Sequence, residues 1–496
     1  MSAVVVIGAG LAGLSTACHL AGRGYDVTVV EREDIPGGRS GLLQRDGFTF
    51  DTGPSVLTMP DLIADVLRAA GSDLSALGPL KRLDPAYRAC YADGSTIMVR
   101  GNREAMRQEI AETCGSVDAA AFEGFVEWLR KLYVVEMPNF IDTNFDSPMG
   151  LLKNPLAAAK LLQLGAFRRL GPVVRSHFQD PRLHRLFSFQ AMYAGLAPEK
   201  ALALYAVITY MDSIEGVFFP EGGMHAVPLA LAQAAEKAGA QFRYGESVEA
   251  VLRSPTGRVA GVRLAGGDAV QADAVVCTLD TPVAYEHLLP ELSPPRGARP
   301  GKGDYSPSAV VWHVGARGLP EGPAAHHNIH FGSEWNTAFD ALLDRGELMP
   351  DPSRMVTMTS ADAPGTAPEG CTTMFVLEPV PNLSGGQIDW TQEAPRMRDR
   401  LHGFLGENGY PDDVVAEELV DPLAWQRQGM AAGTPFALAH TFPQTGPFRP
   451  PNVERRLPGM FFAGSGTVPG VGVPMVLISG KLAAQRVAGY LPGPTP

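Results

Sequence analysis

The chain has 496 residues, which is more than one ordinary domain holds, so two or three substructures are expected. Apolar residues make up 45% and charged residues 19%, a composition typical of a globular protein. The net charge of −12 argues against nucleic acid as a partner, because contacts to the phosphate backbone dominate such binding. The five cysteines are scattered without a C-x-x-C motif, which predicts reduced thiols.

The first predicted element is a buried parallel strand over residues 4–7, followed by the loop Gly8-Ala9-Gly10-Leu11-Ala12-Gly13 and a helix. Gly8 permits a tight turn, Gly10 lets the backbone approach a pyrophosphate, and Gly13 lets the helix pack closely on the strand. A second strand over residues 25–30 ends at Glu31, whose carboxylate would accept a hydrogen bond from a ribose 2′-hydroxyl and disfavour a 2′-phosphate. The pattern predicts an adenine dinucleotide site and argues against NADP.

Further segments favour FAD over NAD. Gly37-Gly38-Arg39 suits a turn against the pyrophosphate with a guanidinium nearby, and residues 47–54 add a strand and a second close-approach glycine, Gly53. Near the opposite end of the chain, residues 460–474 repeat the pattern of a buried strand, a glycine-rich loop and a helix. Two such ends predict one elongated cofactor that is held at both ends, and that cofactor is FAD.

The middle of the chain is predicted to hold other elements. Apolar runs over residues 242–251, 257–264 and 269–278 predict a β-meander that leads into a strand over 274–277. Residues 104–215 show helical spacing, and residues 300–455 combine short strands over 308–314 and 373–377 with loops and a helix near 391–407. The longest apolar stretch, 201–211, falls short of the ~18–20 residues that span a bilayer, and no signal peptide is indicated. A cytoplasmic protein with at most peripheral membrane contact is expected.

Three constellations each allow a functional and a structural interpretation. Residues 151–187 interleave apolar and basic side chains around the single acid Asp180, which is typical of an interfacial helix pair but also of a solvated surface; the basic residues are Lys153, Lys160, Arg168, Arg169, Arg175, Arg182 and Arg185. The histidines of segment 326–330 have no acid or cysteine partner at a matching spacing, so no metal site is predicted. His440 and Gln444 predict either a wall near the isoalloxazine or a structural loop.

The C-terminal segment carries a family resemblance. Gly464-Ser465-Gly466-Thr467 continues into Pro469-Gly470-Val471-Gly472-Val473-Pro474, and with this run the chain resembles the bacterial-type phytoene desaturases, flavoproteins of the carotenoid pathway. Segments 50–60 and 217–224 are similar to further landmarks of that family. The resemblance covers nearly the whole length. It implies an α/β fold with an FAD-binding Rossmann-type domain of the glutathione reductase/amine oxidase kind, assembled from discontinuous segments.

The same resemblance implies a domain plan and a cofactor site. The FAD-binding domain would comprise 1–80, 216–290 and 455–496, a mixed-sheet substrate domain 81–103 and 291–454, and a helical, membrane-facing subdomain 104–215. Many related FAD enzymes have an acid where Ser465 stands, so the polyol contact must be made differently. The expected cofactor-binding residues are Gly8, Ala9, Gly10, Leu11, Ala12, Gly13, Glu31, Arg32, Gly38, Arg39, Gly53, Pro54, Val248, Gly464, Val471, Gly472 and Val473.

The family implies successive desaturations of phytoene to lycopene, by hydride transfer to flavin N5 and loss of a proton, at the membrane surface. Quinone or oxygen would reoxidise the flavin. The flavin carries the difficult step and the protein supplies an apolar slot, so no catalytic residue is assigned. The alternatives are a desaturase, oxygenase or isomerase of another carotenoid, a flavin amine oxidase with an aromatic cage, and a non-catalytic isoprenoid-binding protein. The sequence does not determine the number of steps, the electron acceptor or the oligomeric state.

Overall fold

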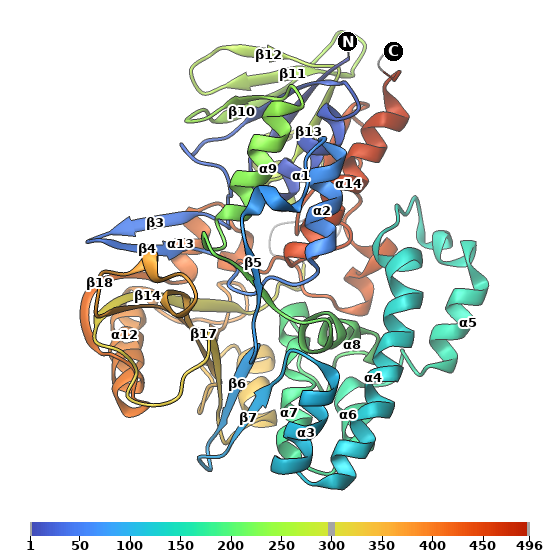
Figure 1. Ribbon diagram of the computed structural model, residues 1–496. Helices are drawn as coiled ribbons and strands as arrows, with labels where there is room; N and C mark the ends of the chain where they lie inside the picture. The colour runs from blue at the N-terminus through green and yellow to red at the C-terminus, as the bar shows by residue number, and fades with distance from the viewer. Residues whose placement is uncertain (1, 296–302, 494–496) are drawn as a thin grey trace.

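The computed structural model describes residues 2–295 and 303–493, and the side chains of Leu152 and Lys153 lie outside this description. The predicted ranges 291–454 and 455–496 therefore extend over residues that are not described. In Figure 1, a parallel sheet and its helices lie above a larger mixed sheet, and helices from residues 103–214 lie beside the lower sheet.

The upper sheet is entirely parallel and has the strand order β19-β13-β1-β2-β9. Its central strand β1 is apolar at every position from 4 to 7 because it faces two cores: Val4 and Val6 pack under helices, whereas Val5 and Ile7 pack under a second, smaller sheet. The sheet thus draws its strands from both ends and the middle of the chain: β1 Ala3–Ile7, β2 Asp26–Val30, β9 Gln241–Arg243, β13 Ala274–Cys277 and β19 Met460–Phe462.

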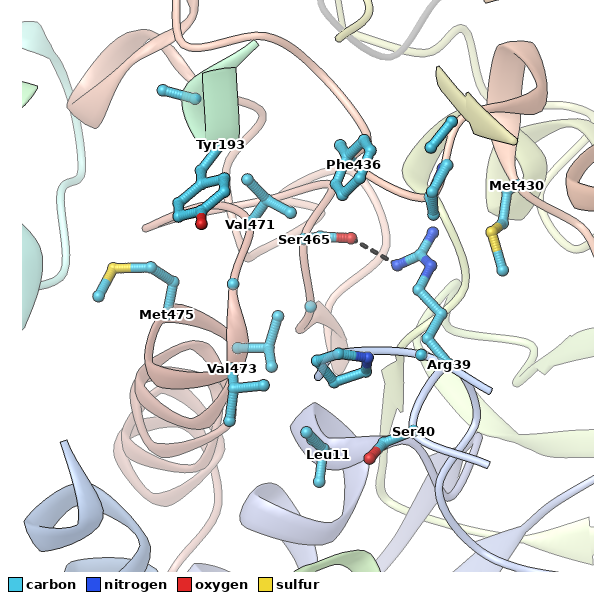
Figure 2. A pocket seen from close by; sticks show the side chains of 18 of the residues that line it. Leu11, Arg39, Ser40, Tyr193, Met430, Phe436, Ser465, Val471, Val473 and Met475 are labelled. Atoms are coloured by element: carbon cyan, nitrogen blue, oxygen red, sulfur yellow. Dashed lines mark hydrogen bonds between the residues drawn. The ribbon is translucent and has the colours of Figure 1, made fainter. Parts of the chain in front are cut away.

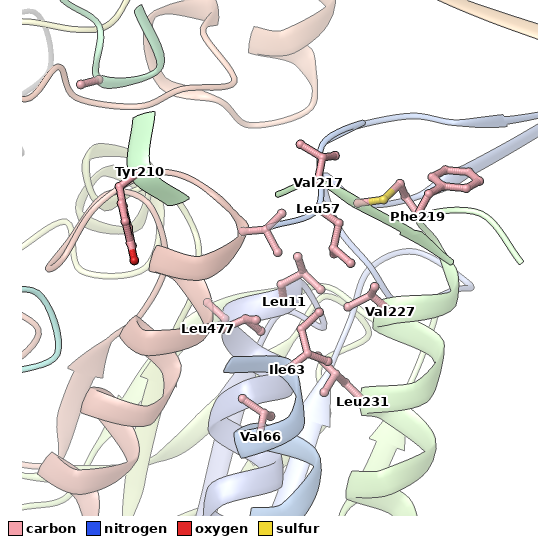
Figure 3. Close-up of a cluster of buried hydrophobic side chains, with 14 of the residues drawn as sticks. Leu11, Leu57, Ile63, Val66, Tyr210, Val217, Phe219, Val227, Leu231 and Leu477 are labelled. Atoms are coloured by element: carbon pink, nitrogen blue, oxygen red, sulfur yellow. The ribbon is translucent and has the colours of Figure 1, made fainter. Parts of the chain in front are cut away.

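The helices on one face of this sheet pack at very short range. The first helix, α1 (Leu11–Ala21), lies between the last, α14 (Val473–Tyr490), and α9 (Ala226–Lys237), and α2 (Pro60–Ala69) contacts all three (Figure 1). A Cβ on Gly480 would overlap the carbonyl oxygen of Ala12, so only glycine permits this approach. The hydroxyl of Ser15 donates a 2.7 Å hydrogen bond to the carbonyl of Leu477 across the same contact. Figure 3 shows the apolar core that these helices share, including Leu11, Ile63, Leu231 and Leu477.

The predicted meander forms the smaller sheet on the opposite face. Strands β10 (Val248–Arg253), β11 (Val259–Leu264) and β12 (Ala269–Gln271) are antiparallel neighbours, and β13 follows them. The prediction was wrong in one respect: the apolar run over 242–251 is not one strand. Gly245 has a φ of +70° and breaks it, so that β9 joins the parallel sheet and β10 joins the meander.

The lower sheet has seven strands in the order β18-β14-β17-β16-β15-β6-β7, and every pair except β15–β6 is antiparallel. Helix α12 (Trp390–Glu407) covers one face through Met397 and Leu401, so the predicted helix near 391–407 is confirmed. The predicted strands 308–314 and 373–377 are also confirmed, within longer ones. The bounds are β6 Tyr87–Tyr91, β7 Thr96–Val99, β14 Ser308–Arg317, β15 His327–Phe331, β16 Arg354–Met358, β17 Cys371–Val380 and β18 Asp413–Val420.

The predicted helical region is confirmed. Its longest helix, α4, buries Phe122, Phe125, Val126, Leu129 and Leu132, as their spacing predicts. No helix among the residues that the structure describes is long and apolar enough to cross a membrane. The helices are α3 Arg103–Thr113, α4 Ser116–Glu136, α5 Pro155–Gln163, α6 Leu170–His177, α7 Pro181–Leu186 and α8 Ala206–Thr209.

The remaining strands and α-helices are short. They comprise two antiparallel pairs, β3 Leu42–Arg45 with β4 Phe48–Asp51 and β5 Leu80–Arg82 with β8 Phe218–Pro220, and the helices α10 Thr281–His287, α11 Asn336–Asp340 and α13 Pro422–Arg427. The cysteines are free thiols, as predicted.

The close contact between α1 and α14 predicts opposite effects for two glycines of one helix. Gly480→Ala should lower the free energy of unfolding by about 1–3 kcal/mol, because its methyl group overlaps the α1 backbone. Gly489→Ala is the matched control: it is exposed in the same helix with no atom near its Cβ position, and should stabilise by up to about 1 kcal/mol. Denaturant unfolding measures both, and equal effects would contradict the assigned contact.

Candidate functional site

A cavity of about 1530 Å³ lies between the two large sheets. Single-ligand pockets commonly have volumes of roughly 300–1,000 Å³, so this one has room for two ligands. The carboxyl ends of four parallel strands open into it, since Gly8, Glu31, Thr278 and Gly464 follow β1, β2, β13 and β19 and all line the cavity. The carboxyl edge of a parallel sheet is where α/β folds bind dinucleotides.

All of the predicted cofactor residues except Ala9 and Gly13 line this cavity. Ala9 lies behind the surface, and its N–H donates a 2.6 Å hydrogen bond to Glu31. Gly13 lies directly behind Gly8, where a Cβ would overlap the Gly8 carbonyl oxygen. Helix α1 begins after Gly10 without a side-chain cap, so its first N–H groups are available to an anion.

Glu31 is buried at the end of β2, and backbone groups hold both of its carboxylate oxygens. Oε2 accepts a hydrogen bond from the N–H of Ala9, and Oε1 accepts one of 3.0 Å from the N–H of Glu33. This orientation leaves the carboxylate at the cavity wall, where it can still accept from a ligand hydroxyl. The neighbouring Arg32 also lines the cavity, and its guanidinium donates to the carbonyl of Gln428.

Arg39 connects the N-terminal and C-terminal halves of the site (Figure 2). Its Nη1 donates to the Ser465 hydroxyl at 2.7 Å, and its Nη2 donates to Oδ1 of Asp280 at 2.9 Å. Its Nε is buried without a hydrogen-bond partner among the described residues. An unpaired buried donor at this edge fits the anionic pyrophosphate of a dinucleotide such as FAD.

Asp280 is a site residue that the sequence analysis missed. It lines the cavity beside Ser465, and its Oδ2 accepts from the N–H of Ala431 at 3.0 Å. Its signal was its position, since it follows the predicted strand 274–277 and therefore lies at the carboxyl edge of the sheet. An acid is thus present next to Ser465, although it comes from a different strand.

The two sequence landmarks around residues 50–60 and 217–224 meet in space. The carboxylate of Asp51 accepts from the N–H groups of Met224 and His225, both at 2.9 Å. Burial raises the pKa of Asp51 above its ordinary value. Gly53 permits a close approach, as predicted, but the approaching group is the backbone of Arg39: a Cβ on Gly53 would overlap its carbonyl oxygen. Pro54 and Val248 line the cavity nearby.

The C-terminal glycine loop is tied down from behind by Arg449, which is fully buried. Its guanidinium donates to the carbonyls of Ser465 and Thr467 in this loop and of Leu438 in a neighbouring one. The loop ends at Gly472, with a φ of +110°, where α14 begins without a side-chain cap. A second helix N-terminus therefore opens into the cavity, and Val471 and Val473 lie beside it (Figure 2).

The rest of the cavity wall is mostly apolar. It follows the face of the seven-stranded sheet opposite α12 and continues into the helical region. Tyr193 and Phe436 lie near Val471, between the two parts (Figure 2). Members of this apolar wall include Val311, Ile329, Phe331, Met355, Phe375 and Leu377 from the sheet, and Phe140, Leu161, Leu204, Ile208 and Met211 from the helical region.

The histidines behave as structural groups or as wall residues. His326 contacts Asp362 and His327 contacts Thr357, and within residues 2–295 and 303–493 no three His, Cys, Asp or Glu residues form a metal-binding group. For the segment around residue 440, the sequence allowed either a cavity wall or a structural loop, and each describes one of its residues. His440 lines the cavity, whereas Gln444 hydrogen-bonds the backbone of Asp304 as part of a structural loop.

Much of the basic charge in residues 151–187 is paired within the molecule. Arg175 pairs with Glu199 and Arg182 with Asp180, while Arg185 donates to the carbonyls of Gly332 and Ser333. Arg169 donates to the carbonyl of Lys200, and Lys160 and Arg168 are exposed. The side chain of Lys153 lies outside the described residues.

Several large apolar side chains in and near α5 are exposed to solvent. Leu156 is 81% and Leu162 66% exposed, and Met149 and Phe167 are exposed beside them. Two other residues of α5, Ala158 and Leu161, line the cavity. Helix α5 therefore separates the cavity from the outside, at the edge of the molecule in Figure 1.

Known proteins resemble this chain in both sequence and fold. Residues 11–488 match the family model described as flavin containing amine oxidoreductase. The chain is 49% identical to a phytoene dehydrogenase of Streptomyces griseus over 492 residues, covering 98% of this chain and 95% of that protein. It is 36% identical to a zeta-carotene-forming phytoene desaturase of Myxococcus xanthus over 491 residues, covering 98% and 93%.

A crystal structure of an oxidoreductase from Methanosarcina mazei shares the fold, with a TM-score of 0.62, 17% identity and coverage of 97% of this chain and 100% of that one. The expected FAD-binding fold of the amine oxidase kind is confirmed. The chain belongs to the flavin containing amine oxidoreductase family and is an FAD-dependent oxidoreductase.

Proposed function

We propose that this protein is a phytoene desaturase that introduces successive C=C bonds into phytoene, with lycopene as the final product. One observation carries the proposal: the carboxyl edge of the nucleotide-binding sheet opens into a cavity whose other walls are apolar. The near full-length relatives in Streptomyces griseus and Myxococcus xanthus, whose names state phytoene dehydrogenation and desaturation, support the same substrate. Quinone or oxygen is the proposed acceptor for the electrons.

In this proposal the predicted residues hold FAD at both ends. The N-termini of α1 and α14 and the unpaired Nε of Arg39 face its negatively charged groups, and Glu31 accepts from the ribose. Asp280 keeps Arg39 oriented through their ion pair. The proposed FAD-binding domain is 1–80, 216–290 and 455–496, beside a substrate domain of 81–103 and 291–454.

The substrate would lie against the apolar wall. FAD, when bound, supplies a two-electron oxidant that accepts a hydride. The side chains of the sheet face, such as Phe375 and Leu377, exclude water from the polyene chain and orient it by shape, since the substrate has no polar group to bind. A purely aliphatic substrate therefore needs a long apolar slot more than it needs specific hydrogen bonds.

The helical region 104–215 is the proposed membrane-contacting part of a cytoplasmic, peripherally bound protein. Helix α5 exposes Leu156 and Leu162 to the outside and lines the cavity with Ala158 and Leu161. An interfacial helix with this arrangement would let an insoluble substrate pass from lipid to the cavity without crossing water. Lys160 and Arg168 lie where they can meet anionic headgroups.

Incubation with phytoene in liposomes tests the proposed reaction. The FAD-loaded protein should bleach its flavin absorbance without oxygen, and should release products whose polyene absorption lies at longer wavelength. A purified protein that carries FAD but is reduced by amines and not by phytoene would identify an amine oxidase. A protein that binds phytoene without flavin would identify an isoprenoid carrier instead.

Removal of the Asp280 charge should weaken cofactor binding. Asp280→Asn keeps the shape but removes the ion pair with Arg39, so the dissociation constant for FAD should rise by roughly 10- to 100-fold, which corresponds to about 1.4–2.8 kcal/mol. Titration of the apoprotein with FAD measures this change. Asp268→Asn, in an exposed turn between β11 and β12, is the control and should bind FAD like the wild type. Equal affinities would contradict the role assigned to Asp280.

Charge introduced at the exposed leucines of α5 should reduce membrane binding. Leu156→Glu combined with Leu162→Glu is expected to weaken binding to anionic vesicles at least tenfold, because two apolar contacts are lost and two negative charges are added. Flotation with vesicles measures binding. Leu319→Glu changes an equally exposed leucine beyond β14 and is the control. The membrane assignment fails if all variants float like the wild type.

A further inference from the structure

Within the part of the chain that the structure describes, a buried acid of the cavity wall has a carboxylate oxygen without a hydrogen-bond partner. Glu136 is the last residue of α4, lines the cavity and is 4% exposed. Its Oε1 has no hydrogen-bond partner among the residues that the structure describes. The other acids of the wall have partners: Asp280 with Arg39, Asp212 with Tyr87 and Gln190, Glu31 with backbone N–H groups, Glu33 with Arg32, Glu246 with Arg243, Glu334 with Thr337 and Glu418 with Arg45.

An unpaired carboxyl in an apolar wall costs stability, because its hydration is lost and nothing replaces it. Burial raises the pKa of Glu136 well above its ordinary value. A methionine would fill the same space without this cost, so packing does not account for an acid here. The same desolvation makes the ionised carboxylate a stronger base than an exposed glutamate.

Few charged groups act on Glu136. Tyr205, in the turn before α8, is the titratable neighbour: its pKa is raised to about 12, mainly by burial and to a smaller extent by Glu136. The titratable groups on the elements packed against α4 are either exposed, as Lys160 on α5 is, or engaged with other residues. The ion pairs and hydrogen bonds are Arg103 with Glu123, Arg175 with Glu199, Asp142 with Lys481 and Asp212 with Tyr87. His177 packs against Phe125 and Trp128, and Tyr210 packs against Tyr133.

A short chain of contacts connects Tyr205, the titratable neighbour of Glu136, with the C-terminal glycine loop. The Tyr205 hydroxyl is 2.7 Å from the hydroxyl of Thr445 and donates to the carbonyl of His440. The His440 ring lies 6.0 Å from the Tyr205 ring and fills the space where Gly470 would carry a Cβ. Glu136 lines the same cavity as His440 and residues 471–472, where the flavin end of the cofactor is proposed to lie.

We propose that Glu136 is the catalytic base that accepts the proton lost by the hydrocarbon substrate. The inference rests on the proposed desaturation. For each new double bond, the substrate gives one hydrogen with its electron pair to the oxidised FAD. The adjacent carbon then gives up a proton to the Glu136 carboxylate, and the electrons of that C–H bond form the C=C bond. The carboxylate also opposes the positive charge that develops on the substrate. Glu136 then releases its proton to water before the next cycle.

Anaerobic single-turnover measurements with the FAD-loaded protein and phytoene liposomes test this role. Glu136→Gln should slow flavin bleaching at least 100-fold, as expected for loss of a general base. In the wild type, the rate should rise with pH over a range above that in which exposed glutamates titrate, because only the ionised carboxylate accepts a proton, and the variant should lack this rise. Glu127→Gln, on the surface of the same helix, is the control and should retain both the rate and the pH profile.

Stability against pH is a second, independent readout. Because the folded-state pKa of Glu136 is raised, the wild type loses stability as the pH rises from the ordinary glutamate value through that raised pKa. The difference in Tm between Glu136→Gln and the wild type should therefore grow with pH in favour of the variant. FAD content should stay unchanged.

The outcomes separate the two proposals. A wild type that phytoene does not bleach refutes the desaturase proposal and this inference with it. Normal bleaching in Glu136→Gln, with the pH profile intact, overturns only the inference. If Glu136→Gln does not fold, Glu136→Asp decides: the inference requires a slower rate with the pH dependence retained, and a lost dependence overturns it.

Discussion

The close packing of α1 on α14 is the contact on which the rest of the site depends. Each helix begins at one glycine-rich loop, and the two loops belong to opposite ends of the chain. Gly480 brings the helix axes together because it has no side chain to meet the Ala12 backbone, and hydrogen bonds from Ser15 and Thr16 hold the pair in register. Two helix N-termini are thereby fixed at one cavity, where their partial positive charges add.

Two arginine side chains, Arg39 and Arg449, stabilise the loops of the site by hydrogen bonds and an ion pair. Arg39 joins the N-terminal loop to Ser465 and Asp280, and so connects three strands of the parallel sheet through one side chain. Arg449 is solvated entirely by backbone carbonyls, and burial lowers its pKa to about 10, which still leaves it charged. A buried charge with several hydrogen bonds is costly to displace, so these two arginines keep flexible, glycine-rich segments in one conformation.

The cavity combines two environments that suit two kinds of ligand. One part presents helix N-termini, an unpaired arginine donor and carboxylates, and the other presents the apolar face of a sheet. The dipoles and charges favour a polar cofactor, while the apolar face favours a hydrocarbon. Glu136 is an exception within the apolar part, since its buried Oε1 has no hydrogen-bond partner among the described residues. Such exceptions are commonly found at functional sites.

Local patterns in the sequence were enough to predict the parallel strands, the glycine loops, the meander and the cofactor. Strands and glycine turns are encoded by residues that are close together in the sequence, so a short stretch of sequence is enough to predict them. The family resemblance extended this prediction to a carotenoid substrate. The sequence also indicated a helical region, because its apolar residues recur at helical spacing.

Only the tertiary structure decided which distant residues meet. Asp280 and Arg39 are far apart in sequence, and neither one shows by itself that it will form an ion pair. Gly53 lines the cavity and also packs against the Arg39 backbone. In the basic segment 151–187, Arg175 pairs with Glu199 and Arg185 with the carbonyl of Gly332, partners that lie outside that segment. Glu136 had no sequence signal, because its proposed role depends on an oxygen that has no partner among the described residues. Burial and pairing are properties of the packed chain, so they become visible only after the chain has folded.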